Sequence, residues 1–415
     1  MLSFVPILAF SATILASPIN TRDDRPRYVL GKYLVQVKPD VNVASIAAHH
    51  DTVRRLARRD ATHEPIERTF SVGNLNAYLG DFDAATVPEI EALDEVLSIV
   101  QDEYVYLEKT DFPPLESRDL VTQSPSIWSL GDLSHKAAGA TEYVYDSSAG
   151  EGTTAYVFDT GIRLTHQEFE GRARFGINGV TNSTDPSGAS ADTDGHGTHC
   201  AGTVAGKTFG AAKKASLVDV KVFDGESGTT SAILTGIQWA VNDVVSRNAQ
   251  ASSVFSMSLS ARTSSTLLDD AVKAAYDAGI LSIVAAGNEN SAIGDTTPAR
   301  APESFTVGMT QPDRGRVSII ADIYGSNFGP EMDVFAPGRD IVSASHLSDT
   351  GNSTKTGTSM ATPLVAGLVC YLRALEGGLE SPKAVGDRIL GLALKDVVSD
   401  PRGSPNLLVN NGNGR

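Results

Sequence analysis

Two histidines lie three residues apart in the glycine-rich stretch GHGTHCAG, residues 195–202. Histidine acts in proteins either as a metal ligand or as a general base. Zinc helices of the HExxH type place their histidines at i and i+4 and add a glutamate base, and neither feature occurs here. Glycines flank His196 and allow a tight turn into a helix. The spacing therefore argues against His196 and His199 as a metal pair and leaves one catalytic base beside a neighbouring histidine.

Three more polar residues stand where apolar segments end or begin. Asp159 ends the strand-like stretch TTAYVFD, Asn288 follows LSIVAAG, and Ser359 follows a glycine and leads into an apolar helix. Free N–H groups at a helix start, together with a side-chain amide, can stabilise the oxyanion that forms when a serine attacks a carbonyl. Each residue also has an ordinary structural explanation, which is a turn for Asp159 and Asn288 and a helix cap for Ser359.

The elements that must position these residues begin at about residue 121, where strand-like and helical segments alternate. Strand patterns occur at 153–159, 216–223, 252–259 and 281–287, with helical patterns at 230–248 and 265–279. Long apolar strands joined by helical crossovers predict an α/β domain with a doubly wound, mostly parallel sheet that is covered on both faces. Active groups in such sheets lie at the C-terminal ends of strands, where Asp159 stands.

The N-terminal part of the chain has a different organisation. Residues 31–108 follow the order β-α-β-β-α-β, which predicts a small α+β unit of the ferredoxin-like type. His49 and His50 lie on a basic helix of this unit and are expected at the surface. Residues 109–120 contain Pro-Pro and charges without a period, as in a linker. Residues 1–16 are apolar and read as a secretory signal peptide, with a buried N-terminal helix as the alternative.

Composition limits the partners. The chain has 34 basic and 50 acidic side chains and a formal charge of −16, which argues against a nucleic-acid partner. We expect no membrane span after the N-terminus. The two cysteines, Cys200 and Cys370, lie in apolar helical patterns and favour buried free thiols. Asn182 and Asn352 each begin an NST sequon, so both are candidate glycosylation sites that can equally remain unused.

Taken in chain order, Asp159, His196, Asn288 and Ser359 resemble the active-site groups of the subtilisin-type serine proteases. The stretches SSAGEG, GHGTHCAGT, VAAGNEN, DVFAPG, GTSMATP and GSPNLL are similar to the proteinase K branch, above all to its secreted fungal alkaline proteases. The resemblance covers nearly the whole chain. It implies a serine endopeptidase with His196 as general base, Asp159 as the carboxylate that orients it, Ser359 as nucleophile and Asn288 as oxyanion donor.

The resemblance also implies a zymogen. Residues 1–16 would be the signal peptide, 17–118 an inhibitory propeptide with its folded part at about 31–108, and 119–415 the peptidase domain. The enzyme itself is expected to cut between about Glu116 and Val121. Its partners would be protein and peptide substrates and its own propeptide. We expect a secreted monomer, with the vacuole as the alternative destination.

Members of this family often bind a structural calcium ion, although catalysis needs no cofactor. The matching ligands would be the carbonyls of Pro302 and Ser304 and the side chain of Asp333, and hard oxygen ligands suit Ca²⁺. An apparent insertion at Ile319 to Gly325 lies between them in sequence.

Ser258, Leu259 and Ser260 match the strand that binds the substrate backbone in these enzymes. Ser260, Ala261 and Arg262 stand where glycines are usual, and their Cβ atoms predict a preference for smaller residues before the cut bond. These changes, the insertion, and Leu364 in place of the usual histidine motivate an alternative. The chain would then be a non-catalytic secreted paralogue that binds peptides or protein partners.

Overall fold

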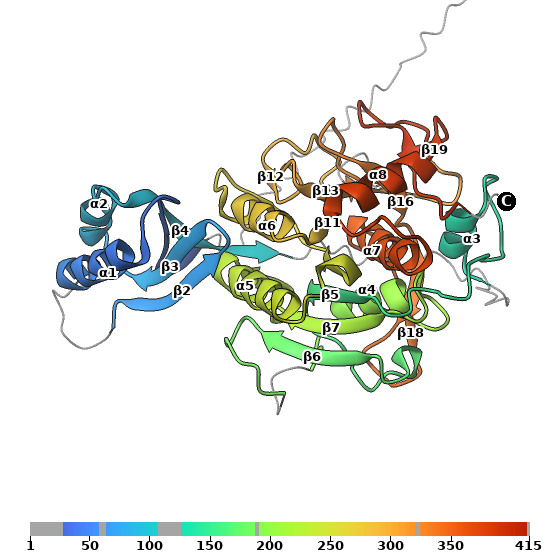
Figure 1. Ribbon diagram of the computed structural model, residues 1–415. Helices are drawn as coiled ribbons and strands as arrows, with labels where there is room; N and C mark the ends of the chain where they lie inside the picture. Colours follow the sequence, from blue (N-terminus) through green and yellow to red (C-terminus); the bar gives the residue numbers. More distant parts are fainter. Residues whose placement is uncertain (1–27, 58–63, 107–125, 187–190, 320–323, 413–415) are drawn as a thin grey trace, which may run out of the picture.

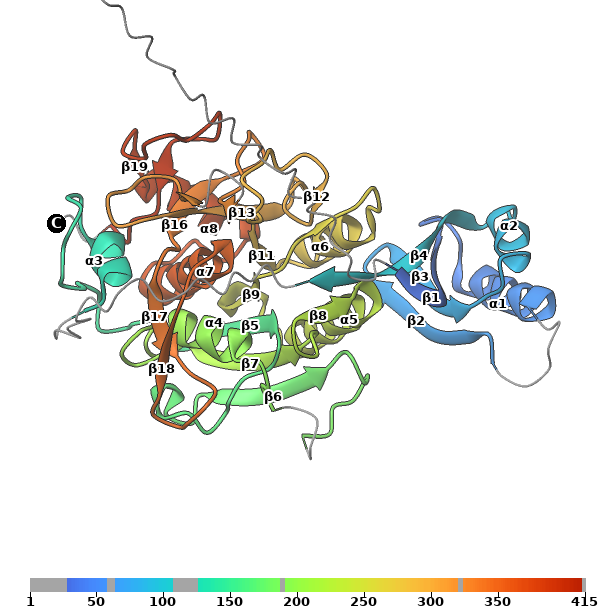
Figure 2. The same cartoon turned by 180° about the vertical axis from the view of Figure 1, so that it is seen from behind.

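The computed structural model describes residues 28–57, 64–106, 126–186, 191–319 and 324–412. A small N-terminal unit sits against a larger α/β unit, as Figures 1 and 2 show from opposite sides. The predicted signal peptide and the predicted cleavage region between Glu116 and Val121 lie outside the described residues.

The N-terminal unit follows the predicted order of strands and helices. Its elements are β1 (Tyr28–Val37), α1 (Val43–Ala57), β2 (Ile66–Val72), β3 (Leu75–Asp81), α2 (Thr86–Glu91) and β4 (Val96–Tyr106). The strands pair antiparallel in the order β2-β3-β1-β4, and both helices cover one face of this sheet (Figure 1). Val35, Val53 and Ile90 belong to the small core between helices and sheet.

His49 corrects one expectation about this unit. Its side chain is buried rather than at the surface, and its Nε2 lies 2.9 Å from the Tyr78 hydroxyl. Burial lowers the pKa of the imidazole. The helix turns His49 toward the sheet because its neighbour Val53, four residues on, belongs to the core.

The larger unit is built on a nine-stranded sheet in the order β19-β20-β16-β13-β11-β9-β5-β7-β6. The strands are β5 (Thr154–Asp159), β6 (Ala173–Asn178), β7 (Ser216–Lys221), β9 (Ser253–Met257), β11 (Leu281–Ala285), β13 (Ser304–Thr310), β16 (Val334–Pro337), β19 (Leu394–Lys395) and β20 (Leu407–Leu408). Neighbours from β6 to β20 pair parallel, and only β19 pairs antiparallel. The predicted doubly wound, mostly parallel sheet is confirmed.

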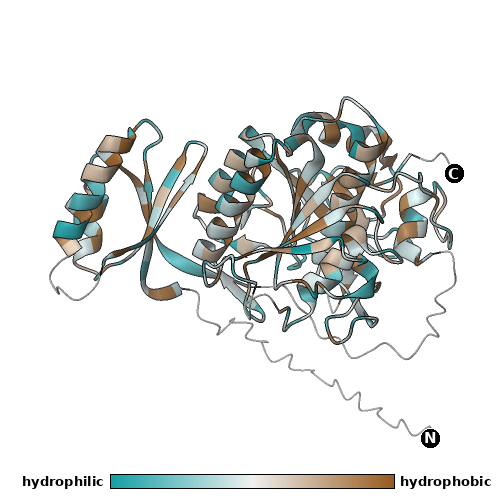
Figure 3. Cartoon of the chain, turned by 60° about the horizontal axis from the view of Figure 1, so that its bottom comes forward, coloured by the Kyte–Doolittle hydropathy of each residue, from teal (hydrophilic) through white to brown (hydrophobic). Residues whose placement is uncertain are grey.

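Helices cover both faces of this sheet. On one face α4 (His196–Ala205) and α7 (Thr358–Leu375) share a core with Val157 of β5, and on the other α5 (Thr230–Ser246) and α6 (Leu267–Asp277) share a core with Phe158. Adjacent residues of β5 therefore face opposite cores, which explains why the strand is apolar throughout. Figure 3 shows apolar residues concentrated on the strands between the helical layers.

Shorter elements complete the larger unit. They are α3 (Trp128–Ser134), η1 (Gln167–Phe169), β8 (Ser227–Thr229), η2 (Gln250–Ser252), β10 (Ala261–Arg262), β12 (Thr296–Thr297), β14 (Ser318–Ile319), β15 (Tyr324–Gly325), β17 (Ile341–Ala344), β18 (Asn352–Lys355) and α8 (Pro382–Leu392). The stretch that looked like an insertion contributes β14 and β15, which pair antiparallel.

Helix α7 alone, among the described residues, is long and apolar enough to suit a bilayer. The helix extends on both sides of the apolar run 364–372, and 83% of its 18 residues are buried inside the protein. Leu364 lies within this buried part. Helix α7 is apolar because its side chains share one core with those of α4 and the sheet.

The two units are joined through the end of β4, which pairs antiparallel with β8. Just before this pairing, Asp102 is buried and accepts hydrogen bonds from the backbone N–H and the hydroxyl of Ser231, at 3.2 and 2.6 Å. Ser231 belongs to the first turn of α5, so a carboxylate of the small unit satisfies the start of a helix in the larger one. Burial raises the pKa of Asp102.

Candidate active site

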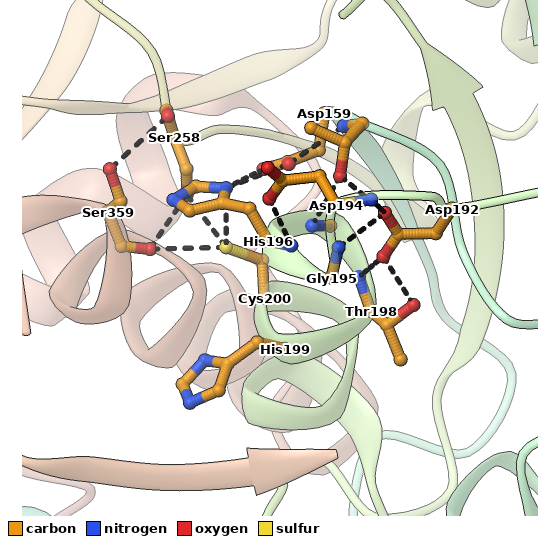
Figure 4. A network of polar contacts seen from close by, with 12 residues as sticks. Asp159, Asp192, Asp194, Gly195, His196, Thr198, His199, Cys200, Ser258 and Ser359 are labelled. Atoms are coloured by element: carbon orange, nitrogen blue, oxygen red, sulfur yellow. Dashed lines mark hydrogen bonds and ion pairs between the residues drawn. The ribbon is translucent and has the colours of Figure 1, made fainter. Parts of the chain in front are cut away.

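Three buried side chains come together from three elements. Asp159 is the last residue of β5, His196 is the first residue of α4, and Ser359 lies in the first turn of α7. The His196 Nδ1 lies 2.8 and 2.9 Å from the two carboxylate oxygens of Asp159 (Figure 4). The strand end and the two helix starts meet at the C-terminal edge of the sheet, as parallel topology requires.

The aspartate determines which imidazole nitrogen is free. Because a carboxylate accepts hydrogen bonds, Nδ1 of His196 carries the proton and Nε2 is left with its lone pair. Nε2 is buried, has no hydrogen-bond partner, and lies on the side of the ring that faces Ser359 (Figure 4). The Ser359 hydroxyl donates to the Ser258 carbonyl at 3.3 Å. A rotation of the serine side chain would direct its proton to Nε2, and such contacts are commonly loose without substrate.

Asn288 places an amide donor beside the serine. Its Oδ1 accepts from the backbone N–H and the hydroxyl of Thr358, at 2.8 and 3.1 Å. This leaves the Nδ2 group as a buried donor without a partner. A Cβ atom on Gly357 would lie 3.6 Å from Nδ2, so a glycine keeps the space next to the amide open. An anion in this space would receive a hydrogen bond from Asn288.

His199 is not paired with His196. It is fully buried on the far side of α4, and its Nε2 donates to the carbonyl of Ile341 at 2.9 Å. Burial lowers the pKa of His199 to about 3.

Among the described residues, the side chains that could together hold a metal ion are instead Asp159, His196 and Cys200, whose ligand atoms lie within 4.8 Å of one another. Burial, with a smaller contribution from Asp159, raises the pKa of the Cys200 thiol well above its usual range. Because a metal binds the thiolate, this environment disfavours a metal at Cys200. Cys200 and Cys370 are both buried and free, as predicted.

We expect the buried His199 to make the larger unit sensitive to acid. In the unfolded chain His199 binds a proton below about pH 6.5, whereas in the folded protein it stays neutral down to about pH 3. The free energy of unfolding that is present above pH 6.5 is therefore lost as the pH falls through this range. His199→Asn removes this titration. The free energy of unfolding of the unsubstituted protein, relative to the variant, should fall by about 2 kcal/mol between pH 7 and pH 5.

The measurement is denaturant unfolding of both proteins in a Ser359→Ala background, which prevents autolysis. Tryptophan fluorescence reports on the larger unit, since Trp128 and Trp239 both lie in it. Parallel pH profiles for the two proteins would show that His199 is not responsible.

The predicted substrate-binding residues follow β9. The Ser258 hydroxyl donates to the Ser359 carbonyl at 2.9 Å, Leu259 belongs to the core shared with α5 and α6, and Ser260 is buried. Ala261 and Arg262 then form β10, which pairs antiparallel with β12. Leu259 can therefore offer its backbone to a substrate, while its side chain packs away from the serine.

The predicted calcium ligands lie at the edge of β13. Asp333 is the residue before β16, and its Oδ2 accepts the backbone N–H of Thr306 at 2.7 Å, two residues beyond Ser304. Burial raises the pKa of Asp333 to about 6, and no cationic side chain among the described residues acts on it. A half-buried carboxylate with one neutral hydrogen-bond partner fits a site for a cation, because a cation would compensate the charge. Pro302 is exposed nearby in sequence.

Both candidate glycosylation residues are exposed. Asn182 lies in the turn after β6, and Asn352 begins β18. Asn182 also lines a crevice of about 270 Å³ between the two units, with Arg68 and Phe70 of β2 on one side and Trp239 of α5 on the other.

Sequence reasoning missed Asp192 and Thr160. Both are buried next to the Asp159–His196 pair, and they are joined by a hydrogen bond of 2.8 Å. The sequence feature that could have indicated Asp192 is its position in the loop DTDGHG, four residues before His196. An aspartate there is ordinarily interpreted as a helix cap.

A doubly wound sheet with an aspartate, a histidine and a serine at its C-terminal edge defines a serine peptidase of the subtilisin type. The sequence pattern of the subtilase family matches residues 150–407, and that of the peptidase inhibitor I9 family matches residues 32–108. The chain belongs to the subtilase family, and its N-terminal unit is an I9 inhibitor domain. It is thus a serine endopeptidase that carries its own inhibitor.

Related proteins are similar over their full lengths. Alkaline protease 1 of Aspergillus oryzae is 45% identical over 414 residues, which are 98% of this chain and 97% of that protein. Alkaline proteinase of Hapsidospora chrysogena is 42% identical over 407 residues, or 96% of each chain. The crystal structure of a cold adapted subtilisin-like serine proteinase is 39% identical with a TM-score of 0.62, and it covers 69% of this chain and 99% of that one.

Proposed function

We propose that Asp159, His196 and Ser359 carry out peptide-bond hydrolysis in this chain and that Asn288 stabilises the oxyanion. The observation that carries the proposal is the hydrogen bond from His196 Nδ1 to both oxygens of Asp159, which leaves Nε2 as an unpartnered base facing Ser359. A hydroxyl is a weak nucleophile until such a base takes its proton.

The reaction follows from the positions of these groups. His196 Nε2 removes the hydroxyl proton as Ser359 Oγ attacks the substrate carbonyl, and Asp159 stabilises the imidazolium that results. The carbonyl oxygen becomes an anion that Asn288 Nδ2 and the backbone N–H of Ser359, at the start of α7, can hold. The imidazolium then protonates the leaving amine. Water, activated by the same imidazole, hydrolyses the acyl-enzyme on Ser359.

A peptide library tests this function and its specificity together. The mature protein should cleave internal peptide bonds, and a sulfonyl fluoride should stop the reaction by labelling Ser359 alone. Because Ser260 and Ala261 carry Cβ atoms where similar enzymes usually have glycines, we expect small residues before the cut bond. A profile dominated by Phe and Tyr would contradict the specificity, and cleavage that continues after labelling would contradict the mechanism.

Asn288→Ala should lower kcat by about 10²–10³ and leave KM nearly unchanged, because the amide acts on charge that develops only in the transition state. This size of loss is the one known for the corresponding donor of a subtilisin. Steady-state kinetics on one peptide would measure it, with the exposed Asn242→Ala of α5 as a control. A change confined to KM would assign Asn288 to substrate binding.

The I9 domain supports a proposal about maturation. The end of β4 occupies the edge of β8 and so leads the chain from the inhibitor domain to the peptidase domain. We place the propeptide at 17–118 and the mature enzyme at 119–415, with self-cleavage between Glu116 and Val121. The non-catalytic alternative has no support from the matched families or relatives.

We further propose that the enzyme is secreted as a monomer after removal of residues 1–16, with the vacuole as the other destination. The apolar N-terminus and the exposed NST sequons at Asn182 and Asn352 support entry into the secretory pathway. The acidic charge supports the absence of a nucleic-acid partner, and the buried position of α7 supports the absence of a membrane span within the part of the chain that the structure describes. Intact mass before and after glycosidase treatment of the culture medium would test secretion and glycan occupancy.

The carbonyls of Pro302 and Ser304 and the carboxylate of Asp333 are proposed to hold a structural calcium ion, which would supply positive charge to a half-buried carboxylate. A chelator should lower the melting temperature of the inhibitor-blocked enzyme by several degrees, because a ligand at about 100 times its Kd contributes about 2.7 kcal/mol. Asp333→Asn should abolish the response to calcium. A melting temperature that changes with neither the chelator nor added calcium would contradict the proposed calcium site.

A further inference from the structure

Asp192 lies in the loop before α4 and is 7% exposed. Its Oδ2 accepts the backbone N–H and the hydroxyl of Thr198, at 2.9 and 2.6 Å. Its Oδ1 accepts the backbone N–H of Gly195 at 2.7 Å, beside further contacts shown in Figure 4. These donors belong to the start of the helix whose first residue is His196, so Asp192 fixes that start.

Thr160 connects this helix start to the strand that carries Asp159. The Thr160 hydroxyl donates to Asp192 Oδ1 at 2.8 Å and accepts the backbone N–H of Gly197 at 2.9 Å. The backbone N–H of Thr160 itself donates to Asp159 Oδ1 at 2.8 Å. The buried Thr160 thus contacts the carboxylate of Asp159, the carboxylate of Asp192 before His196, and the backbone N–H of Gly197 after it.

A helix cap alone does not explain this arrangement. A cap accounts for the bonds from Gly195 and Thr198, but the Thr160 hydroxyl comes from the residue directly after β5, 32 residues earlier in the chain. The two elements also approach closely, since a Cβ atom on Gly197 would lie 2.2 Å from the Gly161 carbonyl oxygen and 3.0 Å from Asp159 Cβ. At such a close approach, a small displacement of α4 changes the geometry of the Asp159–His196 pair.

We propose that Thr160 and Asp192 are positioning residues that hold β5 and α4 at the separation where His196 Nδ1 meets Asp159. The inference rests on the proposed function, because it concerns the orientation of the same base. Neither residue touches the reacting atoms. Their effect should therefore appear in kcat, where the imidazole must be aligned, and not in KM.

Thr160→Val tests this inference, because it keeps the shape of the side chain and removes the hydroxyl. We expect kcat to fall by about 10–100-fold with KM within about twofold of its starting value. Thr160→Ser restores the hydroxyl and should return most of the activity. The matched control is Thr153→Val, which removes another buried hydroxyl just before the other end of β5, where it donates to the Gly150 carbonyl at 2.6 Å.

Asp192→Asn gives an independent check through a double-mutant cycle with Thr160→Val. If the two residues act through one contact, the double variant should be little worse than the poorer single variant. The self-cleavage of the proform is a single turnover at the same serine, so a variant that matures slowly also reports the effect. Variants that accumulate only as unfolded proform would show that Thr160 and Asp192 support folding and would overturn a positioning role.

Two further results would overturn the inference while leaving the proposed function intact. The first is a folded Thr160→Val with kcat within about twofold of the unsubstituted enzyme. The second is a Thr160→Ser that loses as much kcat as the valine variant. Loss of activity in Thr153→Val would point to general destabilisation of β5. An inactive unsubstituted enzyme would contradict the proposed function itself.

Discussion

Ser359→Ala should leave the protein as an uncut proform, while the unsubstituted protein loses its propeptide. The serine hydroxyl is the nucleophile that attacks the peptide bond in the proposed mechanism, and water enters only after the acyl-enzyme has formed on this serine. Turnover should fall by about 10⁶, the size known for the corresponding serine of a subtilisin. Intact mass of the two products measures this directly, and the expected mass of the mature form is that of residues 119–415. The exposed Ser246→Ala of α5 is a matched control and should mature normally.

Each other outcome has a defined meaning. If both proteins stay full length, the chain is catalytically silent, and the non-catalytic binding function returns. If both are cut alike, another protease processes this protein, and peptide substrates must test Ser359. A mature mass that differs from residues 119–415 by a few residues would move the cleavage site within the proposed segment without affecting the nucleophile.

Asp159→Asn should lower kcat by about 10⁴ while the protein still folds. The carboxylate accepts the Nδ1 proton of His196 through both oxygens, and an amide can turn its NH₂ group toward the ring instead. The imidazole would then carry its proton on Nε2, where it can no longer accept one from Ser359. Kinetics on a peptide substrate, normalised by active-site titration, would measure the loss.

The exposed Asp277→Asn on α6 is the control for removal of one negative charge. A loss below about tenfold in Asp159→Asn would mean that another group orients His196. The substitution is informative because Asp159 also accepts the backbone N–H of Thr160. An asparagine can keep that second hydrogen bond, so the end of β5 should stay in place. The variant therefore reports the effect of the His196 tautomer alone.

Much of this molecule can be predicted from local patterns. The order of strands and helices in both units, the parallel sheet and the buried thiols follow from apolar periodicity and from the lengths of the connections. The positions of Asp159 and His196 at element ends follow from the same periodicity, because glycines mark where each strand or helix begins or ends. The spacing of these residues did not determine their chemical roles, and the resemblance to a known family then predicted those roles.

Other features depend on which residues meet across the fold, and sequence reasoning failed there. The basic character of α1 suggested an exposed His49, but one face of the helix packs on the sheet and buries it against Tyr78. The match of Leu259 to a substrate-binding strand stays a prediction, to which the structure adds that its side chain belongs to the core shared with α5 and α6.

The sequence by itself determined the small α+β unit and the larger α/β unit, their order, and the group of residues that is proposed to perform acyl transfer. Only the tertiary structure decided that Nε2 of His196 is free, that Asp102 satisfies the start of α5 across the two units, and that Thr160 and Asp192 tie β5 to α4. The physical reason is that a periodic pattern reports the environment of one segment. A hydrogen bond between distant segments depends on how packing brings them together, and no single segment records that.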